Sequence, residues 1–118
     1  MKSLTIGKYT LERPLFLAPM AGVTDYAFRS LCREMGAAYT VSEMVSAKAL
    51  CYEQKAKKES FSSPTAALAA IFCEDMPMAI QIFGHEPEIM AEAAAMLEKR
   101  FEPHMIDINM GCPVNKIF

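Results

Sequence analysis

The sequence predicts an α/β fold with a parallel sheet, and three observations predict it. Short apolar runs of strand length recur along the 118 residues. Segments with helical spacing of apolar residues separate these runs. Polar residues follow several of the runs, at the ends where parallel α/β enzymes place their working groups. Regular alternation of strand and helix implies parallel strands joined by right-handed crossovers.

The expected elements follow one another in a simple order. They are a hairpin with strands 4–6 and 9–11, strand 15–18, a helix from Thr24 or Asp25 to 35, strand 39–42, helices 46–58 and 63–73, strand 78–83, helix 87–100 and strand 105–109. Apolar and polar residues alternate on both sides of Gly7-Lys8, which predicts the hairpin. The run 15–18 is apolar throughout, which predicts a strand buried on both faces. The first helix keeps its apolar residues at helical spacing and is stopped by Gly36.

The later elements carry their own start and stop signals. Helix 46–58 ends in lysines, which suit the carboxyl end of a helix. Ser63-Pro64 is a typical pair of N-cap and first-turn residues for the next helix. Gly84 ends strand 78–83, and Pro87 opens the helix that follows it. The order is therefore β-α-β-α-β-α-β, preceded by a small β-hairpin.

Two closures of the sheet fit this order: an open doubly wound sheet and part of a (β/α)8 TIM barrel. Ser42-Glu43, Gln81 and Asn109 fall at or near the carboxyl ends of strands, where barrel enzymes place functional groups. The first strand is not followed by G-x-G-x-x-G, which disfavours a dinucleotide-binding sheet. We therefore expect the N-terminal half of a TIM barrel. A full barrel takes about 250 residues, so residues 1–118 are expected to form one partial barrel domain.

Composition excludes several classes of protein. The hydrophobic fraction of 53% and the charged fraction of 22% are those of a folded globular chain rather than a disordered one. A net charge of −2 provides no global field that attracts nucleic acid. The longest apolar run, 66–73, is too short to cross a bilayer. The four cysteines lack C-x-x-C spacing, which argues against a zinc site or a disulfide scaffold and for a reducing, cytoplasmic location.

Cys112 is the sharpest candidate for chemistry. It follows the last strand in a Gly-Cys-Pro turn, where a thiol suits either a nucleophile or a proton donor. The alternative is a buried small hydrophobe, as most free cysteines are. Gln81 and Asn109 are amides at the ends of apolar strands, and they suit either a bound heterocycle with imide groups or bridges to loop backbone. Glu43 is either a site residue or a surface charge.

The remaining candidates have simpler interpretations. Small residues in loop 18–25 let backbone approach a flat ligand closely. His85 and His104 flank helix 87–100 and are expected to face solvent rather than to bind a metal. The other cysteines lie in helical segments and are expected to pack in the core: Cys32, Cys51 and Cys73.

Taken together, the sequence resembles the tRNA-dihydrouridine synthases. The resemblance rests on four blocks in the family's order: 14–25 (PLFLAPMAGVTD), 42–44 (SEM), 79–84 (AIQIFG) and 107–116 (DINMGCPVNK). The blocks span nearly the whole chain, and the last is highly specific. The resemblance implies an FMN-dependent TIM barrel, followed by a helical domain, that reduces particular uridines in tRNA.

The resemblance also implies a role for each candidate residue. The flavin contacts would come from Pro19, Met20, Ala21 and Gln81. Asn109 would help to hold the substrate uracil, and Cys112 would be the general acid. With NADPH as the electron donor, hydride would pass from the flavin to uracil C6 and Cys112 would protonate C5. The uridine would have to leave its stack to reach the flavin.

Several features of the family would lie beyond Phe118, including the late phosphate-binding loops and the helical tRNA-binding domain. We therefore expect this polypeptide alone to be inactive and to self-associate through open barrel edges. Two alternatives remain. One is a non-catalytic, truncated half-barrel that binds neither FMN nor tRNA. The other is a different FMN barrel, such as a dihydroorotate or dihydropyrimidine dehydrogenase, against which blocks 18–25 and 107–116 argue.

Overall fold

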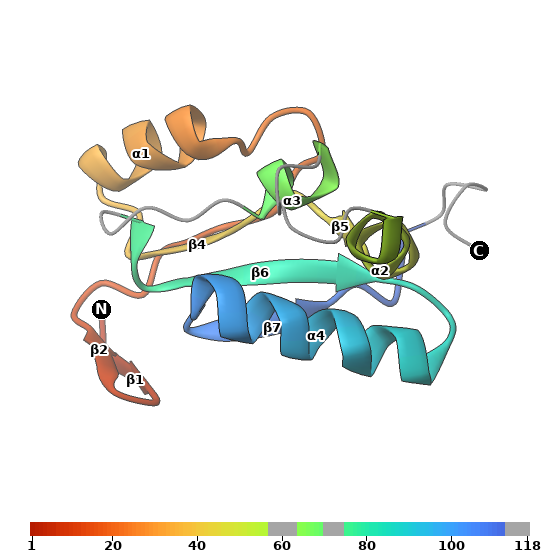
Figure 1. The fold of residues 1–118 in the computed structure, drawn as a ribbon. Helices are drawn as coiled ribbons and strands as arrows, with labels where there is room; N and C mark the ends of the chain where they lie inside the picture. The colour runs from red at the N-terminus through yellow and green to blue at the C-terminus, as the bar shows by residue number, and fades with distance from the viewer. Residues whose placement is uncertain (57–63, 70–74, 113–118) are drawn as a thin grey trace.

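The computed structural model describes residues 1–56, 64–69 and 75–112, which form a hairpin followed by a parallel α/β sheet (Figure 1). The hairpin pairs β1 (Leu4–Ile6) with β2 (Tyr9–Leu11) in antiparallel register. The sheet contains β3 (Phe16–Leu17), β4 (Tyr39–Val41), β5 (Val45–Ser46), β6 (Met78–Phe83) and β7 (Met105–Ile108), and each of its pairings is parallel. The helices are α1 (Tyr26–Glu34), α2 (Ala47–Ala56), α3 (Pro64–Leu68) and α4 (Pro87–Phe101). The predicted alternation of strand and helix is confirmed.

Strand order distinguishes a barrel from a doubly wound sheet. β3 pairs with β4, β4 with β6, and β6 with β7, so these four strands lie side by side in the order in which they occur in the chain. A doubly wound sheet reverses its strand order at a switch point, and the described sheet contains no such reversal. This is the order of the N-terminal part of a (β/α)8 barrel, as the sequence predicted.

Strand β5 was not predicted, and it belongs to a bulge beside β6. β4 and β5 pair end to end with β6, and five residue steps along 40–45 match four steps along 78–82. One extra residue is therefore accommodated on the β4–β5 side, as in a β-bulge. The buried Ser42 hydroxyl accepts a hydrogen bond from the Gln81 amide at 3.0 Å, which satisfies a ladder donor beside the bulge. A two-residue strand has no periodicity, so the sequence pattern could not reveal it.

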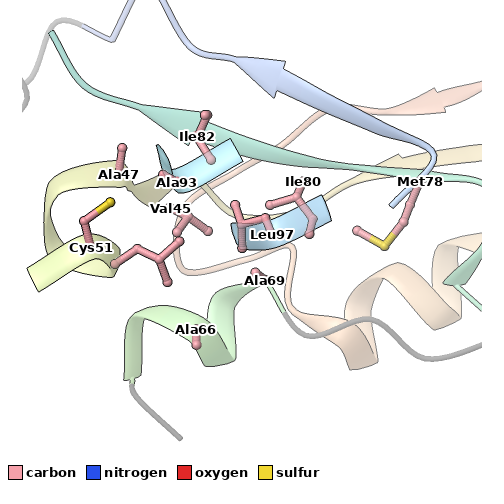
Figure 2. Close-up of a cluster of buried hydrophobic side chains, with 11 residues drawn as sticks. Val45, Ala47, Cys51, Ala66, Ala69, Met78, Ile80, Ile82, Ala93 and Leu97 are labelled. Carbon is pink, nitrogen blue, oxygen red and sulfur yellow. The ribbon is translucent and has the colours of Figure 1, made fainter. Parts of the chain in front are cut away.

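The outer face of the sheet packs against the helices. Alternate residues of β6 point into this core, which Figure 2 shows between the strand and the helices. Its buried members are Val45, Ala47, Leu50, Cys51, Ala66, Ala69, Met78, Ile80, Ile82, Ala93 and Leu97. Each large aliphatic side chain here stabilises the fold by about 1.5–3 kcal/mol through burial.

Of the three helical cysteines that were predicted to pack in the core, Cys51 confirms the prediction. Cys51 is buried, its thiol donates to the Ile89 carbonyl at 3.7 Å, and burial raises the pKa of the Cys51 thiol. Cys32 is half-buried on α1. The prediction for Cys73 lies outside the described residues.

Helix α1 is tied to the segment before β6 by two arginines. The helix begins after Asp25, whose side chain accepts from the Phe28 amide at 2.9 Å, as expected of an N-cap. Arg29 forms a buried ion pair with Asp75, with a nitrogen-to-oxygen distance of 2.9 Å. Arg33 donates to main-chain carbonyls of residues 75–77. These contacts anchor α1, the helix that follows loop 18–25.

The hairpin closes the inner face of the sheet at the end where the strands begin (Figure 1). Leu11 is buried in a cluster with Tyr39 and Ala79. The Tyr39 hydroxyl hydrogen-bonds with His104 Nδ1 at 3.0 Å, and Tyr9 meets the same imidazole edge to face at 4.7 Å between ring centres. The expectation that His104 faces solvent is therefore wrong, because its ring helps to hold the hairpin against β4.

Strand β3 is less buried than the sequence predicted. Leu15 and Phe16 are 48% and 46% exposed, although the apolar run 15–18 indicated burial on both faces. In the described sheet β3 has β4 as its neighbour on one edge and no strand on the other. A continuous apolar run is typical of a strand with a neighbouring strand on each edge. It does not predict how exposed the same strand is at the edge of a sheet.

The first testable consequence concerns Tyr39. Burial, reinforced by the negative charge of Asp107, raises the pKa of Tyr39 to about 12. Because this folded-state pKa lies above the ordinary value of 10.0, the neutral phenol stabilises the fold fully below pH 10. That contribution is lost as the pH rises through about 12. We expect the phenolate absorbance of Tyr39, obtained by subtracting the titration of Tyr39→Phe, to have its midpoint near 12. A midpoint at the ordinary tyrosine value would contradict the desolvated contact with the hairpin.

Candidate active site

The carboxyl ends of the strands converge on one cleft with a volume of about 320 Å³. It is lined by Pro19, Ala21, Met44, Gln81, Asn109, Gly111 and Cys112. These residues come from the loop after β3, the bulge between β4 and β5, strand β6 and the segment after β7. The cleft thus brings together five of the six residues to which the family resemblance gives a role. The sixth, Met20, is 41% exposed and does not line the cleft, and neither does the candidate Glu43.

The loop after β3 is fixed from within by Thr24. Its fully buried hydroxyl accepts from the Met20 amide at 3.0 Å and lies 3.2 Å from the Met20 carbonyl. The amides of Val23 and Thr24 both donate to that carbonyl at 3.0 Å. The backbone at Met20 is therefore held on both sides, and this fixes Pro19 and Ala21 at the wall of the cleft.

Glu43 joins two of the loops that line the cleft. Its Oε1 accepts a hydrogen bond from the Gly22 amide at 2.5 Å. Gly22 has a φ of 74°, a left-handed conformation that glycine adopts readily. Since Glu43 belongs to the bulge, this bond ties the bulge to loop 18–25. Of the two interpretations that the sequence left open, the contact favours a residue of the site, in a structural role.

Gln81 and Asn109 belong to one chain of hydrogen bonds that begins at Asp107. Gln81 Nε2 donates to Asp107 Oδ2 at 2.6 Å, and Asn109 Nδ2 donates to Gln81 Oε1 at 3.3 Å. Asn109 Oδ1 then accepts from the amides of Gly111 and Cys112 at 3.0 and 3.1 Å. Asn109 therefore folds the turn that carries the Cys112 thiol, which is free and half-buried.

The hydrogen-bond chain from Asp107 to Asn109 leaves several donors and acceptors available to a ligand. The second N–H of Asn109 meets the Met44 sulfur at 3.8 Å, which is a weak acceptor that a carbonyl would replace. Gln81 keeps one N–H and one carbonyl lone pair beyond the bonds given above. A Cβ on Gly111 would meet nothing within 4 Å, so the cleft is open on that side. Small residues on the wall and amide groups at the edge suit a flat heterocycle with imide groups.

The part of the chain that the structure describes shows neither a metal site nor a membrane-spanning helix. It contains no group of three or more His, Cys, Asp or Glu side chains that could hold a metal ion. The His85 side chain is 69% exposed, as the sequence predicted. Within residues 1–56, 64–69 and 75–112, none of the helices has the length and apolar character needed to span a membrane.

The fold and the cleft define the class of protein: the N-terminal part of a parallel (β/α) barrel, with its candidate site at the carboxyl ends of the strands. A sequence model described as "Dihydrouridine synthase (Dus)" matches residues 16–118. The chain therefore belongs to the dihydrouridine synthase family, as its motifs predicted.

Curated relatives agree with this family assignment. The chain is 41% identical to tRNA-dihydrouridine synthase B of Pseudomonas aeruginosa, over 99% of this chain and 32% of the relative. It is 40% identical to the protein of the same name from Escherichia coli K12, over 97% of this chain and 33% of the relative. A probable tRNA-dihydrouridine synthase of Treponema pallidum is also 40% identical, over 97% of this chain and 31% of the relative. The chain spans about a third of the length of these relatives.

Proposed function

We propose that the protein reduces uridines in tRNA to dihydrouridine, with FMN as its flavin and NADPH as the electron donor. The observation that carries the proposal is the Asp107–Gln81–Asn109 chain, which folds the Cys112 turn beside a cleft suited to a flat heterocycle. Membership of the dihydrouridine synthase family supports the reaction. The names of the relatives support tRNA as the substrate.

The flavin ring is assigned to the cleft between loop 18–25 and Gln81. Pro19 and Ala21 offer a closely approachable wall, and Met20 between them has an exposed side chain that can cover the ring. Gln81 offers its remaining N–H and lone pair to the ring edge. When bound, FMN supplies the hydride that uracil accepts at C6.

Cys112 is assigned the role of general acid. Hydride addition at C6 moves the electron pair of the C5=C6 bond toward C5 and O4, and a proton at C5 then completes the reduction. A neutral thiol can supply that proton, after which the thiolate takes another from solvent. Asn109 is assigned to hold a uracil carbonyl with the N–H that now meets the Met44 sulfur. The same residue thus orients both the substrate and the turn that bears the acid.

The cysteines support a cytoplasmic setting, and the net charge supports a local contact with tRNA. The free cysteines Cys32, Cys51 and Cys112 suit a reducing compartment, which favours the cytoplasm. The net charge of −2 provides no broad basic surface. We therefore expect residues 1–118 to contact tRNA locally, with most of the tRNA contacts made by other parts of the protein.

Residues 1–118 are interpreted as a partial FMN-binding barrel domain. Apolar side chains are exposed on both outer strands and beyond: Phe16 is 46%, Ile108 54% and Met110 85% exposed. We expect a polypeptide of only these residues to self-associate, to elute from gel filtration above its mass of 13.1 kDa and to lose FMN on desalting. A monomer that keeps stoichiometric FMN would contradict this expectation.

The proposed activity is tested with the purified full-length protein that the gene encodes, rather than with residues 1–118 alone. Its absorbance spectrum is recorded, and it is then incubated with NADPH and unmodified tRNA before nucleoside analysis by mass spectrometry. We expect bound flavin and an NADPH-dependent conversion of uridine to a nucleoside with two more hydrogens. A dihydroorotate or dihydropyrimidine dehydrogenase would bind flavin and act on free pyrimidines but leave tRNA unchanged. A non-catalytic half-barrel would bind no flavin and would also leave tRNA unchanged.

A further inference from the structure

We propose that Asp107 is a positioning residue for Cys112, because it fixes the direction of the hydrogen-bond chain through Gln81 and Asn109. Asp107 does not line the cleft and acts through Gln81, which lies opposite it in the β6–β7 register. The inference rests on the proposed function only in giving Cys112 its role as the acid. The geometric claim concerns the turn and stands apart from the reaction.

The direction of the chain follows from the chemistry of its first member. A carboxylate can only accept hydrogen bonds, whereas an amide side chain has a donor end and an acceptor end. The contact of 2.6 Å therefore requires the nitrogen of Gln81 to face Asp107. The Gln81 carbonyl must then face Asn109, which donates to it at 3.3 Å. The Asn109 carbonyl is left to face the turn.

The turn needs that carbonyl. The amides of Gly111 and Cys112 are both donors, and Asn109 Oδ1 accepts both bonds, at 3.0 and 3.1 Å. If Gln81 reversed, its nitrogen would face the nitrogen of Asn109, and relief of that clash would reverse Asn109 too. The Asn109 nitrogen would then face two main-chain donors, and the turn would lose its acceptor. One acceptor-only group at Asp107 thus sets two amide side chains and the backbone of Cys112.

The test is Asp107→Asn in the chain as its gene encodes it, with amide hydrogen exchange measured residue by residue by NMR. The new side chain has nearly the same shape but offers both a donor and an acceptor, so Gln81 can take either orientation. We expect the amides of Gly111 and Cys112 to exchange about tenfold faster, as for the loss of one hydrogen bond each. The amides of Ser42 and Asn109, which donate to Ala79 and Ile82 carbonyls at 2.9 Å, are internal controls and should keep their rates.

A second variant tests whether the effect comes from the direction of the hydrogen bonds rather than from a general loss of structure. Asp107→Asn combined with Gln81→Glu moves the acceptor-only group from position 107 to position 81, the next member of the hydrogen-bond chain, without changing the net charge. The new carboxylate at position 81 accepts from both of its neighbours, so Asn109 again turns its carbonyl toward Gly111 and Cys112. We expect the double variant to recover the slow exchange that Asp107→Asn loses at these two amides.

Three results would overturn the inference: unchanged exchange at Gly111 and Cys112 in Asp107→Asn, equal acceleration at all four amides, or no recovery in the double variant. Equal acceleration would mean that the sheet, not the turn, depends on Asp107. Exchange needs neither tRNA nor NADPH. Failure of the proposed activity is therefore distinguishable from failure of the positioning role.

Discussion

Cys112→Ala is expected to lower the rate of uridine reduction by about 10²- to 10⁴-fold, the usual contribution of a general acid. Flavin binding and NADPH oxidation should be unchanged, because the proposed flavin contacts come from loop 18–25 and Gln81 rather than from the thiol. The Cys112 amide, not its side chain, makes the bond to Asn109. The turn should therefore survive the substitution. Single-turnover kinetics with unmodified tRNA and pre-reduced enzyme measure the step directly.

The matched control for this variant is Cys32→Ala. Cys32 is also a half-buried free thiol, but it lies on α1 and does not line the cleft. We expect its substitution to leave uridine reduction near the wild-type rate. If Cys112→Ala reduced uridine as fast as Cys32→Ala does, Cys112 would not be the acid.

Arg29→Met is expected to lower the free energy of unfolding by about 3–5 kcal/mol, because it leaves a buried carboxylate without its partner. The Arg29 and Asp75 side chains are 2% and 0% exposed, and their two contacts measure 2.9 and 3.3 Å. Arg29 also donates to the Thr24 carbonyl at 3.0 Å. Since Thr24 holds the Met20 backbone, we expect the same variant to weaken flavin binding. Urea unfolding followed by circular dichroism measures the change in stability.

An exposed ion pair serves as the control for the buried one. Lys48 lies 3.0 Å from Glu86, and these side chains are 69% and 41% exposed. Lys48→Met should change stability by less than about 1 kcal/mol, since solvent screens such a pair. Equal effects of Arg29→Met and Lys48→Met would show that the Asp75 carboxylate is not buried with Arg29 in solution.

Elements with strong local signals were predictable from the sequence. The bounds of β6 are those expected from its apolar run, and α4 begins at Pro87 as predicted. The bulge with β5 was not predictable, because it arises from a register difference between two strands that are distant in sequence. The contact of His104 with Tyr39 was not predicted either, because these residues are also distant in sequence. Neither residue carries a local sign of the other.

The sequence predicted most of the residues that line the cleft, but not the hydrogen bonds among them. Gln81, Asn109 and Cys112 follow or end strands, and parallel strands bring their carboxyl ends to one edge. No local pattern singles out Asp107, because its proposed role depends on pairing across the sheet with Gln81. The sequence left open whether the two amides serve a ligand or loop backbone. In the structure Asn109 bonds the loop backbone and still has an N–H that faces only a sulfur.

The dihydrouridine content of tRNA from cells that lack the gene tests the proposed activity most directly. We expect the deletion to remove dihydrouridine from at least one tRNA position, as measured by mass spectrometry of digested tRNA. The wild-type gene should restore it, whereas the Cys112→Ala gene, expressed at the same level, should not. Dihydrouridine that is unchanged by the deletion, or restored equally by the Cys112→Ala gene, would contradict the assignment of this chain as a tRNA-dihydrouridine synthase with Cys112 as its acid.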